Sequence, residues 1–225
     1  MLKKLGILIS FSIVSLFIYS FVVVYQANLY ADEIILTDYK NGKWRIYEGE
    51  RRRLILSTEN LTPNQVDWLL KIQDPLFYQH EGIDLSTPGA GLTTITQSIV
   101  KKLYFIKFKP GIRKYKQSII AKFVIDKKIT KKEQLNIFIN SVYMGVIEGK
   151  VIYGLAQSSA AYFGKEVSKL DDDEYLSLVA MLIGPNQFNI LEAPEKNKER
   201  VVRIKAVISG EYIPTKLTDV YYNRT

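Results

Sequence analysis

The stretch from Gln73 to Lys101 reads QDPLFYQHEGIDLSTPGAGLTTITQSIVK, and the interpretation of the whole chain depends on it. It places acidic, amide, imidazole and hydroxyl side chains around a turn, and a run of small residues (86–91) leads into a hydroxyl-rich helix start (93–97). A Gly-rich turn before a helix leaves backbone N–H groups unpaired, which suits an anionic oxygen. Lys101 would add a cation on the same helix. Taken alone, the pattern more often marks an ordinary loop and helix cap.

Two motifs in this stretch resemble those of glycosyltransferase family 51, the peptidoglycan glycosyltransferases. The family's first motif is Glu-Asp-x-x-Phe-x-x-His-x-Gly-x-Asp, and its second is Gly-Gly-Ser-Thr-Ile-Thr-Gln-Gln with a Lys a few residues on. The positions that match are Asp74, Phe77, His80, Gly82 and Asp84 in the first motif, and Gly91, Thr94, Ile95, Thr96, Gln97 and Lys101 in the second. Leu92, Thr93 and Ser98 depart from the second motif, and the family's catalytic Glu is Gln73 here.

Later segments continue the resemblance, which covers about residues 62–205. Arg113 and Lys114 match the third motif, Arg-Lys-x-x-Glu, but the second functional Glu of the family is Gln117 here. The segment that begins at Asn140 resembles Asn-x-x-Tyr-x-Gly and includes Tyr143. Segments 153–165 and 170–184 resemble the fourth and fifth motifs. The interval between the first two motifs is shorter than in familiar members of the family, so we expect a donor-side loop of a different shape.

We expect a mainly α fold, a two-lobed lysozyme-like helical domain with a small N-terminal β-hairpin and an N-terminal transmembrane helix. Capping-box patterns start helices at Thr62 and Thr130, and basic helix 194–209 ends before Gly210. Strands at 34–36 and 44–47 flank the turn dipeptide Asn41-Gly42. The expected divisions are a cytoplasmic tail (1–4), an anchor (5–27), a β-rich connector (28–60), the family domain (61–210) and a C-terminal tail (211–225).

The N-terminal apolar run from Leu5 to Tyr25 is long enough to cross a bilayer, which takes about 20 residues. Lys3 and Lys4 indicate that the N-terminus is cytoplasmic. We therefore expect a single-pass protein of the cytoplasmic (inner) membrane whose main domain is extracytoplasmic. A cleaved signal peptide is the rival interpretation. The net charge of +8 favours an anionic partner, and the absence of Cys excludes disulfides and thiolate metal sites.

The resemblance implies polymerisation of lipid II: a sugar 4-hydroxyl attacks the anomeric carbon of the growing strand, and undecaprenyl pyrophosphate leaves. This chemistry needs a general base and cations for the diphosphate. Glutamine cannot accept the proton. Three explanations stay open: a catalytically weak binding protein, an active branch that uses another carboxylate, or an engineered Gln73. The functional prediction is a glycosyltransferase-like protein that polymerises or binds lipid II, with a catalytically inactive scaffold or regulator of cell-wall synthesis as the alternative.

The predicted site divides into catalytic positions and a binding set. The catalytic positions are Gln73 and Gln117, with Asp74, Glu81 and Asp84 as substitute bases. The binding set is His80, Thr93, Thr94, Thr96, Gln97, Lys101, Arg113, Lys114, Asn140 and Tyr143. The expected partners are lipid II, the nascent glycan strand, the cytoplasmic membrane and other cell-wall synthesis proteins.

Several other patterns carry less weight. Ser98-Ile99-Val100-Lys101 fits the penicillin-binding Ser-x-x-Lys pattern, but this chain contains no Lys-Thr-Gly partner. The acidic run 171–173 is better explained as a helix start than as a metal motif. A lone histidine is a poor basis for a metal site. We therefore expect no protein-bound metal, leave Mg²⁺ open as a cofactor, and expect no nucleic acid because the basic segment lies outside the cytoplasm.

Overall fold

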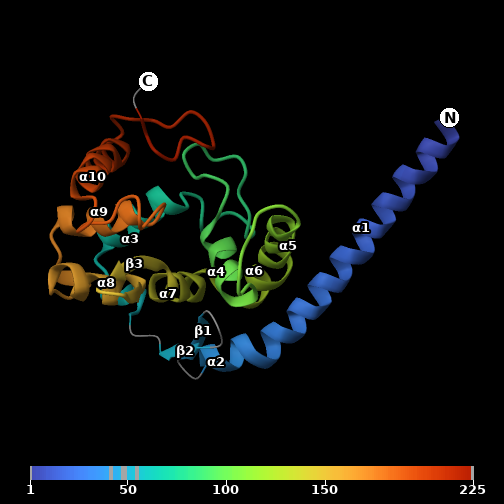
Figure 1. Ribbon diagram of the computed structural model, residues 1–225, viewed down its shortest axis with the longest axis horizontal. Coiled ribbons are helices and arrows are strands. Elements are labelled where there is room, and N and C mark those ends of the chain that lie inside the picture. Colours follow the sequence, from blue (N-terminus) through green and yellow to red (C-terminus); the bar gives the residue numbers. More distant parts are fainter. Residues whose placement is uncertain (1, 41–42, 47–49, 54–55, 224–225) are drawn as a thin grey trace.

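The computed structural model describes residues 2–40, 43–46, 50–53 and 56–223. A long N-terminal helix leads into a rounded helical domain (Figure 1). This helix comprises α1 (Leu2–Tyr30), a π-helical segment η1 (Ala31–Ile35) and α2 (Leu36–Lys40). Its part from Ser10 to Asp38 is long and apolar enough to cross a membrane. The predicted N-terminal membrane helix therefore has the required length and composition.

The small N-terminal hairpin pairs β1 (Lys43–Ile46) with β2 (Glu50–Arg53) in antiparallel register. The strand predicted at 44–47 is thus present within a residue, but the strand predicted at 34–36 is wrong because those residues continue the helix. Extending an existing helix needs no new nucleation, so the N-terminal helix continues through the residues where a strand was expected. The predicted turn at Asn41-Gly42 lies outside the described residues.

The first half of the domain carries the motif-bearing segment. A 3₁₀ turn η2 (Thr58–Asn60) precedes α3 (Pro63–Gln73), which Thr62 starts with the predicted capping box. After the loop 74–94 come α4 (Ile95–Tyr104), α5 (Ile112–Ile120), the π-helical η3 (Ala121–Ile125), the short α6 (Asp126–Lys128) and α7 (Lys131–Ser141). The capping box of Thr130 starts α7 as predicted.

The second half opens with a hairpin that the sequence analysis did not predict. It pairs β3 (Tyr143–Ile147) with β4 (Lys150–Tyr153), and its turn residues Glu148 and Gly149 both have positive φ (49° and 76°). That combination is typical of a two-residue type I′ turn. The remaining elements are α8 (Gly154–Phe163), η4 (Val167–Lys169), α9 (Asp172–Met181) and α10 (Pro194–Ser209). Asp171 caps α9, so the acidic run 171–173 is a helix start.

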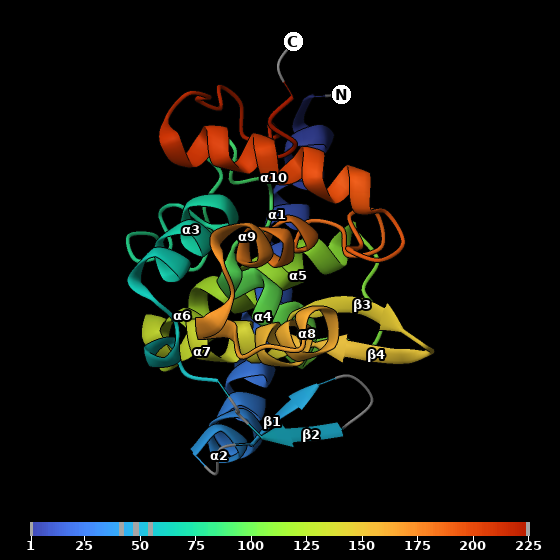
Figure 2. The same ribbon diagram turned by 90° about the vertical axis from the view of Figure 1, so that its left-hand side faces the viewer.

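The helices form two groups that share one core. The elements α4, α5 and α6 lie on the side of the long N-terminal helix, α3 lies with α8, α9 and α10 on the opposite side, and α7 lies between α4 and α8 (Figures 1 and 2). Buried side chains form a continuous cluster that includes Leu69 of α3, Ile99 of α4, Leu135 of α7 and Leu178 of α9. The hydroxyl of Tyr175 on α9 donates to the carbonyl of Gln65 on α3 at 2.7 Å. The prediction of a mainly helical fold with a small hairpin is therefore confirmed.

Candidate functional site

Asp74 joins the end of α3 to the start of α4. Its side chain is 1% exposed, and Oδ1 lies 2.9 Å from Nε2 of His80. Its Oδ2 accepts a hydrogen bond from the backbone N–H of Ile95 at 2.9 Å. Both oxygens are therefore occupied in fixing the loop, and Asp74 is not among the residues that line the pocket described below. His80, which the sequence places in the binding set, thus pairs with Asp74 inside the loop.

Asp84 organises the next turn of the same loop. Its Oδ1 accepts hydrogen bonds from the N–H and hydroxyl of Ser86 at 2.8 and 2.9 Å and from the N–H of Thr87 at 3.2 Å. Burial acts to raise the pKa of Asp84, but the hydrogen bonds from Thr87 and Ser86 outweigh it and lower the pKa to about 2. Asp84 is thus an ionised turn-former, and such a low pKa makes it a weak proton acceptor.

The third acidic candidate, Glu81, points to the surface. Its carboxylate lies 3.2 Å from Nζ of Lys127 and 4.0 Å from Nζ of Lys122. The side chain is 60% exposed. Among the three predicted substitute bases, then, two fix the loop and one pairs with surface lysines.

The hydroxyl and amide side chains at the start of α4 face inward. Thr94 caps α4 in a reciprocal box with Gln97, and its hydroxyl donates to the carbonyl of Gly82 at 2.8 Å. The Thr96 hydroxyl donates to Oε1 of Gln134 at 2.6 Å. Thr94, Thr96 and Gln97 are 4%, 0% and 0% exposed. These three predicted binding residues therefore hold the helix start in place rather than line a surface.

The second amide of the predicted catalytic pair is also internal. Nε2 of Gln117 donates to the backbone carbonyl of Gln97 at 2.6 Å, and the residue is 1% exposed. Asn140 behaves similarly: its side chain exchanges hydrogen bonds with the backbone of Leu56 at 3.0 and 2.6 Å and anchors the segment before α3. The structure places both residues in the framework around the site.

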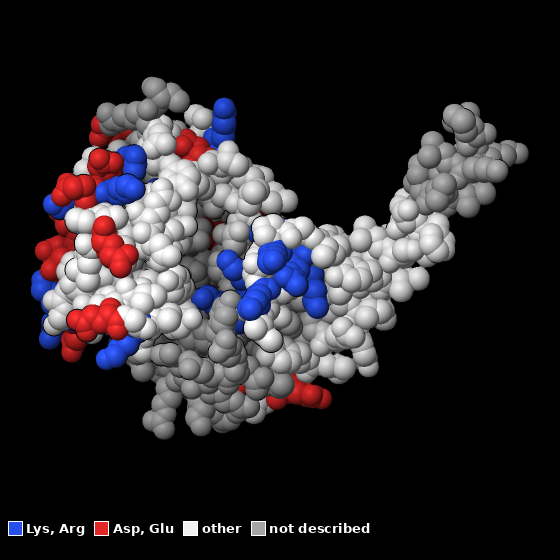
Figure 3. Space-filling view, in the orientation of Figure 1, with Lys and Arg blue, Asp and Glu red and all other residues white. Residues whose placement is uncertain are grey.

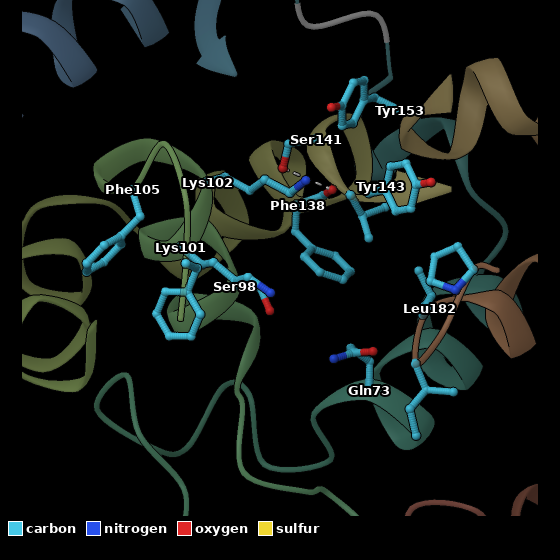
Figure 4. Close-up of a pocket in the computed structure, with 14 residues that line it drawn as sticks. Gln73, Ser98, Lys101, Lys102, Phe105, Phe138, Ser141, Tyr143, Tyr153 and Leu182 are labelled. Atoms are coloured by element: carbon cyan, nitrogen blue, oxygen red, sulfur yellow. Dashed lines mark hydrogen bonds between the residues drawn. The ribbon is translucent and has the colours of Figure 1, made fainter. Parts of the chain in front are cut away.

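Gln73 lies in a pocket of about 530 Å³ between the two helix groups. Figure 4 shows its amide directed into this space from the end of α3, with Ser98 and Lys101 of α4 on the opposite wall. Tyr143 of β3 and Tyr153 of β4 also line the pocket. The other lining residues are Lys102, Phe105, Phe108, Phe138, Ser141, Val142, Leu182, Ile183 and Pro185. In the described part of the chain, this lining includes no Asp, Glu or His.

Two lysines bring positive charge to this pocket. Lys101 is exposed, with its ammonium 5.2 Å from the ring centre of Phe108. Lys102 lies deeper, with its ammonium 4.9 Å from the ring of Tyr153 and 5.9 Å from that of Tyr143. Burial, helped by repulsion from Lys101, lowers the pKa of Lys102 to about 8. The pocket thus combines cations with hydroxyl and aromatic surfaces.

The remaining predicted cations lie on α5 beside the pocket. The ammonium of Lys114 donates to the Leu92 carbonyl at 2.7 Å and to the Thr93 hydroxyl at 2.9 Å. Burial and the nearby Lys101 lower the pKa of Lys114 to about 8. Arg113 is exposed and donates to the Lys107 carbonyl at 3.3 Å. Figure 3 shows Lys and Arg side chains gathered over α5 and the segment before it. Of the three cations in the predicted binding set, Lys101 lines the pocket, Lys114 ties α5 to the loop before α4, and Arg113 lies at the surface.

Lys102, Tyr153 and Ser141 line the pocket but were not among the predicted site residues. Lys102 adjoins a predicted residue, but which of two neighbouring lysines turns inward depends on how α4 packs. Tyr153 comes from the hairpin that was not predicted, and it faces Tyr143 at a ring separation of 6.0 Å. Within the described ranges, no three Asp, Glu or His side chains gather closely enough to hold a metal ion.

Most of the chain is similar to known proteins. A family model described as "Transglycosylase" matches residues 41–209. The chain is 30% identical to penicillin-binding protein 1B of Vibrio cholerae, over 68% of this chain and 21% of that protein. It is 30% identical to penicillin-binding protein 1F of Bacillus subtilis, over 74% of this chain and 25% of that protein. It is also 25% identical to penicillin-binding protein 1A of Escherichia coli, over 79% of this chain and 21% of that protein. The matched region thus spans a quarter or less of these relatives.

Proposed function

Because the chain belongs to the transglycosylase family, we propose that its pocket binds a polyprenyl-diphosphate-linked glycan such as lipid II and turns it over slowly at best. The protein is a peptidoglycan glycosyltransferase-like member of that family. The observation that carries the proposal is the composition of the pocket around Gln73. It offers two lysines, several hydroxyl groups and aromatic rings, and no carboxylate or imidazole among the described lining residues.

Binding is supported by the side chains that line the pocket. Lys101 and Lys102 supply charge for a diphosphate, and a cation in a partly buried site attracts phosphate oxygens more strongly than one in water. Ser98, Tyr143 and Tyr153 offer hydroxyl groups and ring faces to sugars. Gln73 can donate and accept hydrogen bonds with a sugar hydroxyl through its amide.

Slow turnover is supported by the chemistry of the same amide. Transfer of a glycan requires that the attacking hydroxyl lose a proton while the bond from the anomeric carbon to the diphosphate breaks. Lysines stabilise the departing diphosphate, but glutamine cannot take the proton. A positioned general base contributes about 10²–10⁴-fold to such a step. Asp74 and Asp84 are engaged in the loop and Glu81 in surface ion pairs, which argues against their use as a replacement base.

The N-terminal helix supports a location at the membrane. We infer that it crosses the inner membrane once, with Lys3 and Lys4 on the cytoplasmic side and the pocket outside. Lipid II would reach the pocket from the outer leaflet. A bound but unprocessed lipid-linked glycan would suit a scaffold or regulator that also contacts other cell-wall synthesis proteins.

The test compares wild type with Gln73→Glu. We expect both proteins to bind lipid II in detergent or vesicles with similar affinity, and the Glu variant to form glycan strands about 10²–10⁴ times faster because it regains a proton acceptor. Gln79→Glu, the same change at an exposed position of the adjoining loop, is the matched control and should leave the rate unchanged. Equal polymerisation by wild type and Gln73→Glu would contradict slow turnover. Failure of both to bind lipid II would overturn the proposal as a whole.

A further inference from the structure

The C-terminal segment 211–223 lies across the loop that carries the Gly-rich turn (Figure 1). It follows α10 after Gly210 and lies beyond the family match, which ends at residue 209. Two backbone hydrogen bonds join it to the loop: the N–H of Gly89 donates to the carbonyl of Lys216 at 2.9 Å, and that of Gly91 donates to the carbonyl of Leu217 at 2.9 Å. The N–H groups of this turn are therefore already paired, contrary to the expectation that they stay free for an anion.

The fit between the two segments is close enough to require glycine. A Cβ at position 89 would lie 2.8 Å from Cβ and Cγ of Pro214, and one at position 91 would lie 2.9 Å from Cγ1 of Val220. Both glycines also have positive φ (78° and 73°), where a side chain is strained. The backbone of the turn thus packs directly against side chains of the C-terminal segment, and a side chain at either glycine would clash with them.

Tyr222 connects this segment to the pocket. It is 2% exposed, and its hydroxyl lies 3.3 Å from the carbonyl oxygen of Ile72 and 3.4 Å from that of Gly89. Ile72 directly precedes Gln73. Burial raises the pKa of Tyr222 to about 12, so the hydroxyl keeps its proton and donates. One phenol therefore bridges the last turn of α3 and the Gly-rich turn.

A buried arginine holds Tyr222 in place. Arg200 of α10 is 2% exposed, and its guanidinium lies 5.4 Å from the Tyr222 ring centre. Its Nη1 donates to the carbonyl of Val220 at 3.0 Å. Burying a guanidinium is costly unless it is paired, so its position under the C-terminal segment indicates that the segment is a fixed part of the fold.

We propose that residues 211–223 form a strap that sets the position of the Gln73 wall of the pocket, and that Tyr222 is its positioning residue. Through Ile72 the strap fixes the end of α3, and through Gly89 and Gly91 it fixes the turn that precedes Leu92 and Thr93, the two residues that Lys114 contacts. The expected change in lipid II affinity rests on the proposed function, whereas the expected change in amide exchange of the loop does not.

The test replaces Tyr222 by Phe, which keeps the ring beside Arg200 and removes the hydroxyl. Tyr221→Phe is the matched control, because its ring also lies near Arg200 (5.9 Å) but is 41% exposed. Amide hydrogen exchange is measured at Asp74, Gly89 and Gly91, whose N–H groups donate to Leu70, Lys216 and Leu217. Lipid II affinity is measured in parallel. We expect exchange at all three amides to rise about 2–10-fold, as for the loss of one hydrogen bond, and lipid II binding to weaken by a similar factor in Tyr222→Phe alone.

The two measurements separate the two proposals. Unchanged exchange at Asp74, Gly89 and Gly91 in Tyr222→Phe would overturn the strap, whatever the ligand does. Faster exchange with unchanged lipid II affinity would show that the strap stabilises the loop without positioning the pocket, and would overturn the positioning role. If wild type itself binds no lipid II, the proposed function fails, and exchange at Asp74 still decides whether Tyr222 fixes the end of α3.

Discussion

Lys102 carries its charge inside the pocket, close to the rings of both Tyr143 and Tyr153. Its pKa of about 8 follows from burial and from the charge of Lys101. An ammonium with a lowered pKa is less costly to neutralise, so its contribution to anion binding depends on pH in the range where proteins are usually assayed. A bound diphosphate would favour the protonated form and raise the pKa again.

We expect lipid II affinity to fall as pH rises from 7 to 9. Below about pH 8 the Lys102 ammonium is protonated and attracts the diphosphate. Above that pH it loses its proton, and the affinity for lipid II should fall by up to about tenfold per pH unit. Lys102→Met should bind more weakly at pH 7 and lose part of this dependence, with Lys114 left to titrate in the same range, whereas Lys107→Met, at an exposed position, should behave as wild type. Titration of binding by fluorescence or calorimetry at four pH values measures this. If Lys102→Met keeps the pH profile of wild type, the pH dependence of lipid II affinity comes from another group.

At single positions, the sequence predicted the residues around the pocket better than their orientations. Gln73, Lys101 and Tyr143 line the pocket as a binding role requires. Thr96 and Asn140 match the family pattern equally well, yet their side chains form internal hydrogen bonds. Motif spacing shows which residues lie near one another, but the direction of a side chain depends on partners such as Gln134 and Leu56, which are distant in sequence.

Helix starts are the elements that the sequence specified best. Thr62, Thr130 and Asp171 each form the reciprocal capping box that their local patterns indicate. A cap depends on residues within one turn, so no tertiary information is needed to recognise it. The hairpin of β3 and β4 was not predicted, because its turn dipeptide Glu148-Gly149 is not one of the Asn-Gly or Asp-Gly pairs that mark a two-residue hairpin turn.

The cap of α4 should contribute more to stability than the cap of α7. Thr94 is 4% exposed and donates a second hydrogen bond to Gly82, whereas Thr130 is exposed. We expect Thr94→Ala to lower the free energy of unfolding by about 2–3 kcal/mol, because it also leaves a buried carbonyl unpaired. Thr130→Ala should cost about 1 kcal/mol. Denaturant unfolding of both variants measures the difference, and equal losses would contradict the structural role of the Thr94 hydroxyl.

Across the whole molecule, the N-terminal helix is part of the domain as well as an apolar rod. Val23, Ala27 and Ala31 are 4%, 4% and 1% exposed and lie four residues apart on one helix face. The Tyr104 hydroxyl donates to the carbonyl of Ala27 at 2.9 Å, and the hydroxyls of Ser20 and Tyr115 lie 2.7 Å apart. The sequence alone did not indicate this packing, because Val23 lies inside a uniformly apolar run and the two alanines that follow it are too small to mark an apolar face.

Two truncations test that packing in detergent. A chain that starts at Ser20 keeps the packed face and should melt within about 2 °C of wild type. A chain that starts at Thr37 loses the buried contacts of Val23, Ala27 and Ala31, and its Tm should fall by about 5–10 °C. Thermal unfolding followed by circular dichroism gives both values. A Tm that is insensitive to the longer truncation would mean that the helix contributes nothing to domain stability.

The overall architecture was largely predictable because its elements are long and amphipathic, while the relations between distant elements were not. The helix at 194–209 has the predicted bounds, and the helix that starts after Thr62 begins where its capping box indicates. The packing of residues 211–223 on the Gly-rich turn left no local trace, because it depends on backbone contacts between segments more than a hundred residues apart.

The close approach of Pro214 to Gly89 and of Val220 to Gly91 also constrains how descendants of this gene can diverge. A larger residue at either glycine would collide with the far end of the chain unless that end altered in the same lineage. The two regions should therefore accumulate substitutions in compensating pairs. If the turn alone is transferred into a homologue, it should fit poorly against that protein's own C-terminal segment.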